Sequence, residues 1–271
     1  MTLRSFIEDI GSPDRTIAVV NEDAAGPLEA MLTDAFDGQS ISVDPDATVP
    51  SERQLAPEIA TTLETGADTA VLLEDGTPVA ASPMDELYDA LLAINSDLFV
   101  TGARGVGEIE FPDVLSGLAE TRLRLRGYPL AHKEKLLLII VSRYIEQRAW
   151  AGGAGTLRSA FQHLSRLDDE IGTHDVYASL EATDVDIHVY GADSPATIDL
   201  DVTVHTGTAA EYRDGWFVVY NPDEHVDRSD ASALEPAALV CLEVEPRVWD
   251  GFWTYDPDRV AAIDDYIARE L

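Results

Sequence analysis

The chain has 271 residues, and its hydrophobic share of 45% is sufficient for the core of one large domain or two smaller ones. Asp and Glu number 51 against 18 Lys and Arg, which gives a formal net charge of −33 and argues against nucleic acid as a direct ligand. The acidic residues are spread along the whole chain, whereas a tail or one binding face would concentrate them. We therefore expect a surface adapted to molar salt, where screening suppresses self-repulsion, and a halophilic archaeon as the source.

The chain has no recognisable segment that would direct it to a membrane or out of the cell. Residues 1–11 lack the basic and apolar regions of a signal peptide. The longest strongly apolar run, residues 136–141, is far shorter than a membrane span. Cys241 is the only cysteine, and the apolar run 237–244 around it predicts a core position without a disulfide. We expect a cytoplasmic protein that has no membrane partner.

Helical spacing of apolar residues and β-branched runs predict the elements of the first part of the chain. In chain order these are a helix over 3–10, a strand over 16–20, a helix over 28–35, a strand over 40–43, strands over 69–73 and 79–81, a helix over 84–94 that Ser82-Pro83 caps, a strand over 98–101 and a helix over 112–118. Residues 15–43 are expected to form one βαβ unit, and Asp75-Gly76 indicates a hairpin turn. The proline-containing stretch 44–58 is interpreted as a loop.

The second part begins with the most apolar helix of the chain and continues with alternating elements. In chain order we predict a helix over 136–145 that ends at Gly152-Gly153, a helix that Thr156 caps with Leu157, Ala160, Phe161, Leu164 and Leu167 on its core face, a helix over 176–180, strands over 185–190, 202–205, 216–220 and 237–244, a polar loop over 222–235, and a last helix that Asp256-Pro257 begins. This alternation predicts an α/β fold with two halves, each a mixed sheet flanked by helices. We place the boundary between residues 1–130 and residues 131–271.

The motifs of the common enzyme classes are missing from the sequence. Neither lysine follows a glycine, so there is no phosphate-binding P-loop, and Gly102, Gly105 and Gly107 have the wrong order for a dinucleotide fingerprint. There is no Gly-x-Ser-x-Gly elbow, and no two histidines lie three or four residues apart as a helical metal pair would. We therefore predict no catalytic residues, no metal site and no cofactor.

Five segments of the second part carry a resemblance to a known family. They are Ser-Arg-Tyr-Ile-Glu at 142–146, Phe-Gln-His-Leu-Ser-Arg at 161–166, Ile-His-Val-Tyr-Gly at 187–191, Trp-Phe-Val-Val-Tyr at 216–220 and Gly-Phe-Trp-Thr-Tyr-Asp-Pro at 251–257. In their order and spacing, residues 133–271 resemble the DICT sensory domain, which is named for its association with diguanylate cyclases and two-component systems. The first 130 residues resemble the extension found in stand-alone haloarchaeal members.

The resemblance implies a sensory or regulatory role in signal transduction and no established catalytic residues. We therefore expect a non-enzymatic protein that binds a signalling partner protein or a small ligand. Three residues in the segments are candidates for that binding, each with a structural alternative. Gln162, beside the core aromatic Phe161, is expected to bond either a backbone group or a ligand, while Trp216 and Trp253 are core aromatics or ligand-stacking groups.

The basic residues at 122–126 are the one place where the charge departs from the acidic background. Arg122, Arg124 and Arg126 alternate with leucines, so in a strand all three guanidinium groups share one face. Such neighbouring cations need compensation. The protein's own carboxylates are one source, and an anionic ligand or an acidic partner surface, which arginine forks suit, is the other.

Two alternatives from other functional classes stay open at this point. An enzyme of unrecognised type would turn over nucleotides or esters. A transcription regulator would need a DNA-binding element, but no segment has the pattern of a basic recognition helix. The sequence leaves a homodimer open and does not identify the signal, the partner or the output pathway.

Overall fold

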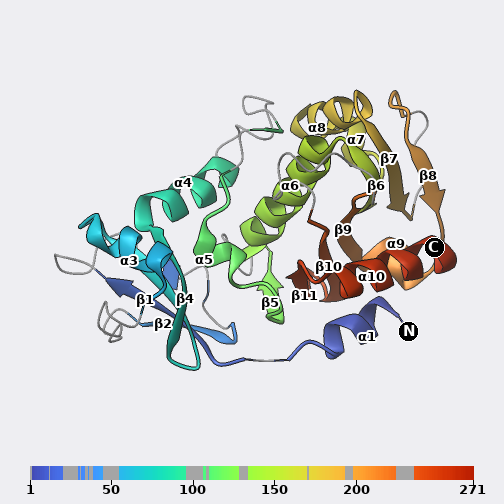
Figure 1. The fold of residues 1–271 in the computed structure, drawn as a ribbon. Coiled ribbons are helices and arrows are strands. Elements are labelled where there is room, and N and C mark those ends of the chain that lie inside the picture. The colour runs from blue at the N-terminus through green and yellow to red at the C-terminus, as the bar shows by residue number, and fades with distance from the viewer. Residues whose placement is uncertain are drawn as a thin grey trace.

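The computed structural model describes residues 2–11, 13–20, 30, 32–33, 36, 39–44, 55–95, 106–107, 110–127, 134–169, 171–192, 198–223 and 235–271, without the side chains of 91–95, 134–136, 168–169 and 171. The predicted strand over 98–101 lies outside the described residues, as do most of the helix over 28–35 and most of the loop over 222–235. The described residues form two mixed sheets with helices packed against them, as Figure 1 shows, which confirms the predicted α/β class.

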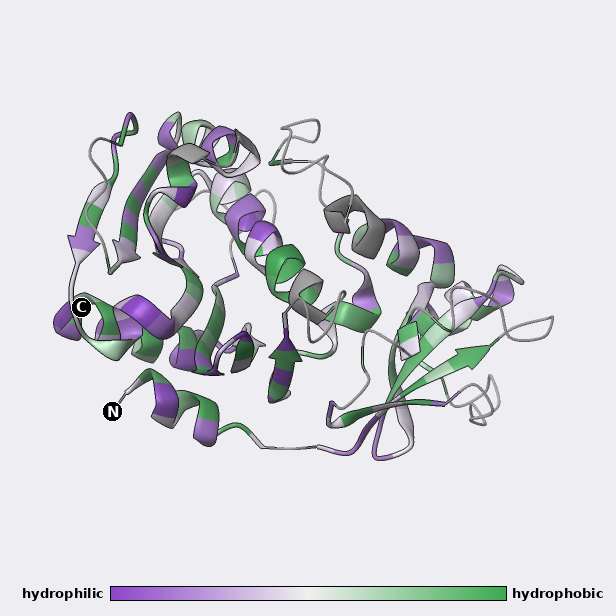
Figure 2. Ribbon diagram, turned by 180° about the vertical axis from the view of Figure 1, so that it is seen from behind, coloured by the Kyte–Doolittle hydropathy of each residue, from purple (hydrophilic) through white to green (hydrophobic). Residues whose placement is uncertain are grey.

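The smaller sheet has four strands in the order β2-β1-β3-β4. These are β1 (Arg15–Val20), β2 (Ile41–Asp44), β3 (Thr69–Glu74) and β4 (Thr77–Pro83). The β1 and β2 strands are parallel, as a βαβ unit requires, and β3 and β4 form the predicted antiparallel hairpin. In Figure 2 the strands of this sheet are predominantly hydrophobic, because both of its faces are covered.

The larger sheet has seven strands in the order β5-β11-β10-β9-β6-β7-β8. These are β5 (Leu123–Arg126), β6 (Ala154–Gln162), β7 (Asp184–Gly191), β8 (Thr203–Thr206), β9 (Gly215–Asn221), β10 (Ala237–Glu245) and β11 (Val248–Thr254). The three strands β6, β7 and β8 are parallel, and every other neighbouring pair is antiparallel.

Helices cover both faces of the larger sheet. The described helices are α1 (Leu3–Glu8), α3 (Pro57–Glu64), α4 (Met84–Asn95), α5 (Asp113–Ser116), α6 (Glu134–Gly152), α7 (Arg166–Asp169), α8 (Ile171–Glu181), α9 (Ala210–Asp214) and α10 (Pro257–Glu270). The α6 face, which includes Leu239 and Cys241, packs against α6 and α8, whereas the α10 face, which includes Ala238 and Val240, packs against α1, α9 and α10 (Figure 1). Alternate residues of one strand thus enter two different cores.

The segment predicted as a helix beginning at Thr156 is the interior strand β6, so that prediction is wrong. Its apolar residues fit helical spacing, but burial alternates over Gly155, Leu157 and Ser159 as in a strand. Gly155 has φ +110°, and a Cβ there would lie 2.5 Å from the carbonyl oxygen of Asn221. Pairing on both sides, with β9 and β7, outweighs the local spacing.

The expected separation of two sheets at residue 130 is also wrong. The strand β5 pairs with β11, so the larger sheet crosses that boundary, and α1 packs on the α10 face of the same sheet. The outer edge of β5 is covered by two side chains that precede β2. The Gln39 amide accepts from Arg124 N at 2.9 Å and donates to its carbonyl oxygen at 2.7 Å, and Ser40 Oγ donates to Arg122 O.

Three smaller differences concern segments whose local pattern was weak. Helix α3 begins at the end of the stretch predicted as a loop, and β11 and α9 were not predicted. Ser82 does not cap α4, because it lies in β4 and its hydroxyl accepts from Val114 N at 3.1 Å. The last helix is as predicted, with Asp256 accepting from Arg259 N at its start.

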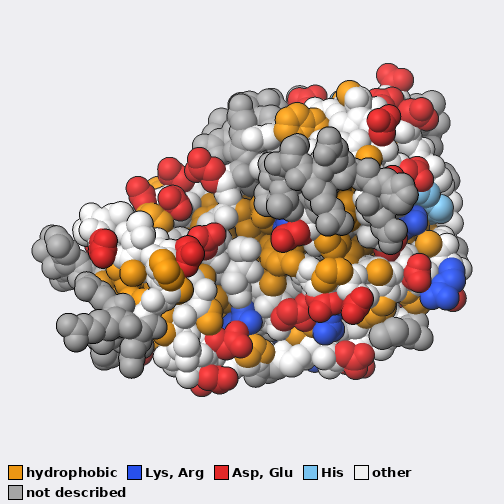
Figure 3. Space-filling view, viewed as in Figure 1, with side chains coloured by type: hydrophobic (Ala, Val, Ile, Leu, Met, Phe, Trp, Pro, Cys, Tyr) orange, Lys and Arg blue, Asp and Glu red, His pale blue; other side chains and the backbone are white. Residues whose placement is uncertain are grey.

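The surface agrees with acidic residues spread along the chain. Figure 3 shows Asp and Glu side chains distributed across the visible face, with a few Arg side chains among them. Over the part of the chain that the structure describes, no helix combines the length and the apolar character that crossing a membrane requires.

Candidate functional site

The three predicted arginines lie on or beside β5 at the edge of the larger sheet, with Leu123 and Leu125 buried between them as the alternation predicted. Arg122 lies 2.9 Å from Asp250, and Arg124 lies 2.6 Å from Glu245 and 3.8 Å from Asp250. The protein's own carboxylates therefore compensate two of these cations.

A shallow pocket adjoins this arginine patch on the α10 face. Its lining residues come from α1, the end of β5 and the β10–β11 hairpin: Arg4, Ile7, Glu8, Arg122, Leu242, Val244 and Asp250. Two cations and two carboxylates balance each other there. The pocket consequently lacks the excess positive charge that would select an anion.

Gln162 occupies an unusual position at the end of β6. The pairing with β7 shifts register between Ala160 and Gln162, and Gln162 itself has φ +58°. This β-bulge turns the side chain into the protein, where only 8% of the residue is exposed. Its Nε2 donates to Glu243 Oε2 at 3.2 Å, and Glu243 also accepts from Arg247 N at 2.6 Å.

Trp216 lies on the α6 face of β9, the strand next to β6. Its indole Nε1 donates to Ser142 Oγ of α6 at 3.0 Å, and its ring contacts Trp249 edge-on with centroids 6.3 Å apart. Trp249 is the register partner of Glu243, which accepts from Gln162. We call Gln162, Trp216, Glu243, Trp249 and Ser142 the Gln162 cluster. The structure thus joins two predicted site residues that are 54 positions apart in the chain.

A buried polar network lies next to the Gln162 cluster. Glu146 of α6 pairs with Arg143 at 2.7 Å and accepts from the Tyr177 hydroxyl at 3.1 Å. Burial, and secondarily the Glu146 charge, raises the pKa of Tyr177 well above its ordinary value, so the hydroxyl keeps its proton. Phe161 contacts Tyr177 at 5.4 Å between centroids and connects the network to the bulge. Three segments of the resemblance, 142–146, 161–166 and 216–220, consequently meet on the α6 face.

Trp253, the remaining predicted site residue, is separate from this cluster. It lies on the α6 face of β11 and is 2% exposed. Its indole Nε1 has no hydrogen-bond partner among the residues that the structure describes. Because the ring is enclosed by the core, it has the position expected of a core aromatic.

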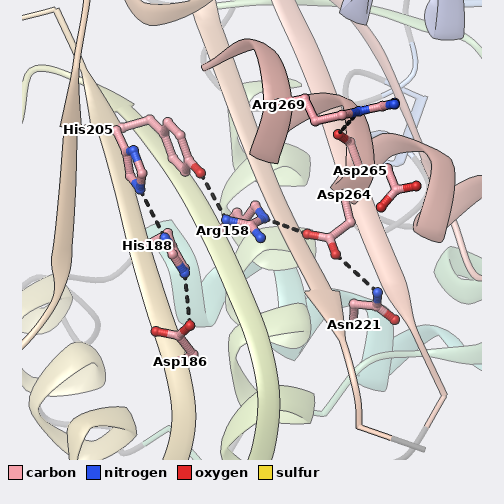
Figure 4. A network of polar contacts seen from close by, with 9 residues as sticks. Arg158, Asp186, His188, His205, Asn221, Asp264, Asp265 and Arg269 are labelled. Atoms are coloured by element: carbon pink, nitrogen blue, oxygen red, sulfur yellow. Dashed lines mark hydrogen bonds and ion pairs between the residues drawn. The ribbon is translucent and has the colours of Figure 1, made fainter.

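A second polar network, on the α10 face, was missed by sequence reasoning (Figure 4). Arg158 of β6 lies 2.5 Å from Asp264 of α10 and donates to the Tyr190 hydroxyl at 3.1 Å. Asn221 Nδ2 donates to the second oxygen of Asp264 at 3.1 Å. Burial opposes the charge of Arg158, but the hydrogen bond and the charge of Asp264 outweigh it and raise the pKa of the guanidinium.

Two histidines extend this second network toward the sheet edge. His188 Nδ1 lies 2.9 Å from His205 Nε2, and His188 Nε2 lies 3.0 Å from Asp186 (Figure 4). The His205 ring stacks on Tyr190 at 4.4 Å with an interplanar angle of 7°. The spacing of Asp186, His188 and Tyr190 by two residues was the available sequence signal, since it places them on one strand face.

Neither network has its side chains arranged around a common metal position. Within the described ranges, no group of three or more His, Cys, Asp and Glu side chains is placed to hold a metal ion. Comparison with known proteins finds no matching family model, no matching curated protein and no matching solved structure.

Proposed function

We propose that this chain is a non-enzymatic sensory or regulatory protein of intracellular signal transduction, and that it binds a small ligand or a partner protein at the Gln162 cluster. The resemblance of residues 133–271 to the DICT family belongs to this proposal, as does a cytoplasmic location. The supporting observation is the conformation of Gln162.

A non-glycine residue at φ +58° costs conformational energy, and such residues concentrate at ligand clamps and switches. The bulge at Gln162 holds a polar side chain against Glu243, whereas a regular strand would have continued the alternation. Glu243 is the register partner of Trp249, which contacts Trp216. An amide that both donates and accepts, together with the half-buried ring of Trp216, suits a ligand that has a polar edge and a flat apolar part.

The test measures retention of ligands and partners by the full chain in molar KCl. The protein is dialysed against a metabolite extract of a halophilic archaeon. It is also used to capture partner proteins from a lysate of the same organism. The informative variant is Gln162→Asn, because Asn tolerates positive φ but is one methylene too short to keep the contact with Glu243. Trp150→Ala is the matched control, since Trp150 is an exposed aromatic on the last turns of α6.

We expect the wild type and Trp150→Ala to retain the same molecule and Gln162→Asn to lose at least about tenfold in affinity, as the loss of one buried hydrogen bond predicts. Equal retention by all three proteins would overturn the assignment of the site. Turnover of nucleotides or esters by the wild type, abolished in Gln162→Asn, would overturn the non-enzymatic role.

A further inference from the structure

The edge strand β8 is weakly attached to the larger sheet. It consists of four residues, Thr203–Thr206, and pairs only with β7. Three of the four are exposed, and His205 alone is half-buried, so its ring supplies the inward side-chain contact of the strand. The preceding Leu200 and Val202 pack against the core of the α6 face, which holds the chain before β8 in place.

The contact between His205 and His188 depends on protonation. A hydrogen bond between His188 Nδ1 and His205 Nε2 at 2.9 Å needs one N–H and one free lone pair. One of the two rings can be protonated while this bond is kept. If both rings are imidazolium ions, two N–H groups face each other, and the bond is replaced by repulsion.

Charged groups lie on one side of the pair. Asp186 accepts from His188 Nε2 at 3.0 Å, so the Nδ1 of His188 is the ring nitrogen that faces His205. Arg158 of β6 is the register partner of His188 and adds a positive charge beside the pair. Asp264 of α10 lies 2.5 Å from Arg158, so its carboxylate is already paired with the guanidinium.

The remaining groups near the pair are two tyrosines and, beyond them, the C-terminal Leu271, which accepts from the Tyr212 hydroxyl. Tyr190 stacks on His205, and Tyr212 of α9 lies against Tyr190 with centroids 6.3 Å apart. Burial raises the pKa of both hydroxyls, so both stay neutral and offer no anion to a second imidazolium.

We propose that the His188–His205 pair is a proton-sensitive latch, in which protonation of both rings breaks the bond between them and releases β8 from the sheet edge. Release would expose the backbone N–H and C=O groups of β7, which is a surface suited to strand addition by a partner. The latch lies on the α10 face and does not depend on the Gln162 cluster.

The pH range follows from the sign of the shift. Burial first, and then the charges of His188 and Arg158, lower the pKa of His205 in the attached state. The released strand has an ordinary histidine pKa of about 6.5 and takes up the proton first. The attached state is therefore fully favoured above that value and loses stability as the pH falls through it.

Amide hydrogen exchange of the full chain in molar KCl tests the latch at about pH 7.5 and about pH 5.5. After correction for intrinsic rates, we expect protection of the β8 amides to fall by up to about tenfold at the lower pH, which lies about one unit below the ordinary histidine pKa, with β10 protection unchanged. His205→Phe keeps a ring on Tyr190 but takes no proton, so its β8 protection should not change with pH. His174→Gln, which alters a half-buried histidine of α8 away from the pair, should behave as the wild type.

A wild-type β8 whose protection is independent of pH would overturn the proposal. So would an equal fall in His205→Phe, or a fall in β10 as large as that in β8. If His205→Phe does not fold, the imidazole resonances of the wild type decide, because the latch requires His205 to titrate below the ordinary histidine pKa of about 6.5.

Discussion

Two strands of the larger sheet present arginines in opposite settings. On β5, Arg124 is 51% exposed and its partner Glu245 is 64% exposed, at the rim of the molecule. On β6, Arg158 is 11% exposed and Asp264 is 13% exposed, beneath α10. An ion pair in water contributes little because solvent screens it, whereas removing one partner of a sheltered pair leaves a charge without solvation. We therefore expect the stability of the fold to depend more on Arg158, the less conspicuous arginine in the sequence, than on Arg124.

Removing salt is expected to have the largest effect, because it acts on the whole net charge of −33. From molar KCl to dilute buffer, the screening length grows from about 3 Å to about 30 Å, and repulsion between the carboxylates increases. We expect the melting temperature, followed by circular dichroism, to fall strongly as KCl is lowered. A melting temperature that is constant across this range would contradict a surface adapted to salt.

Removing the charge of Asp264 is expected to have the next largest effect. In Asp264→Asn the shape is kept, but Arg158 loses its partner, and we expect the free energy of unfolding to fall by about 3 kcal/mol. Asp265→Asn is the matched control, because Asp265 is exposed and contributes only its carbonyl oxygen, to Arg269 (Figure 4). Urea unfolding in molar KCl measures both variants. Equal losses of unfolding free energy in both variants would show that the low solvent exposure of the Arg158–Asp264 pair does not increase its contribution to stability.

Reversing the charge of Arg124 is expected to have the smallest effect. Arg124→Glu replaces an exposed pair with a like charge beside Glu245, and we expect a loss of up to about 1 kcal/mol in urea unfolding. Any ligand retained by the Gln162 cluster should still bind. Binding lost at an unchanged melting temperature would make the patch a recognition surface instead. If neither stability nor binding changes, both interpretations of the patch are wrong.

The sequence alone determined those features whose cause is local. Alternation along β5 separated buried leucines from outward arginines, and Asp75-Gly76 placed the hairpin of the smaller sheet. Asp256 followed by proline placed the start of α10. In each case the deciding contacts lie within a few residues along the chain, so the pattern of residue types contains them. Gln162 and Trp216 were found as polar or aromatic residues in unusual surroundings, without any indication that Glu243 and Trp249 connect them.

Only the tertiary structure decided the features that depend on partners distant in the chain. Residues 154–162 form a strand because β7 and β9 satisfy their backbone groups on both sides, although their apolar spacing is helical. The strand β5 belongs to the sheet of the second part because its backbone pairs with β11. Arg158 and Asp264 are 106 residues apart, and charge alone could not pair them among 51 carboxylates. A buried arginine needs a carboxylate that is buried beside it, and which carboxylate lies there is determined only when the chain folds.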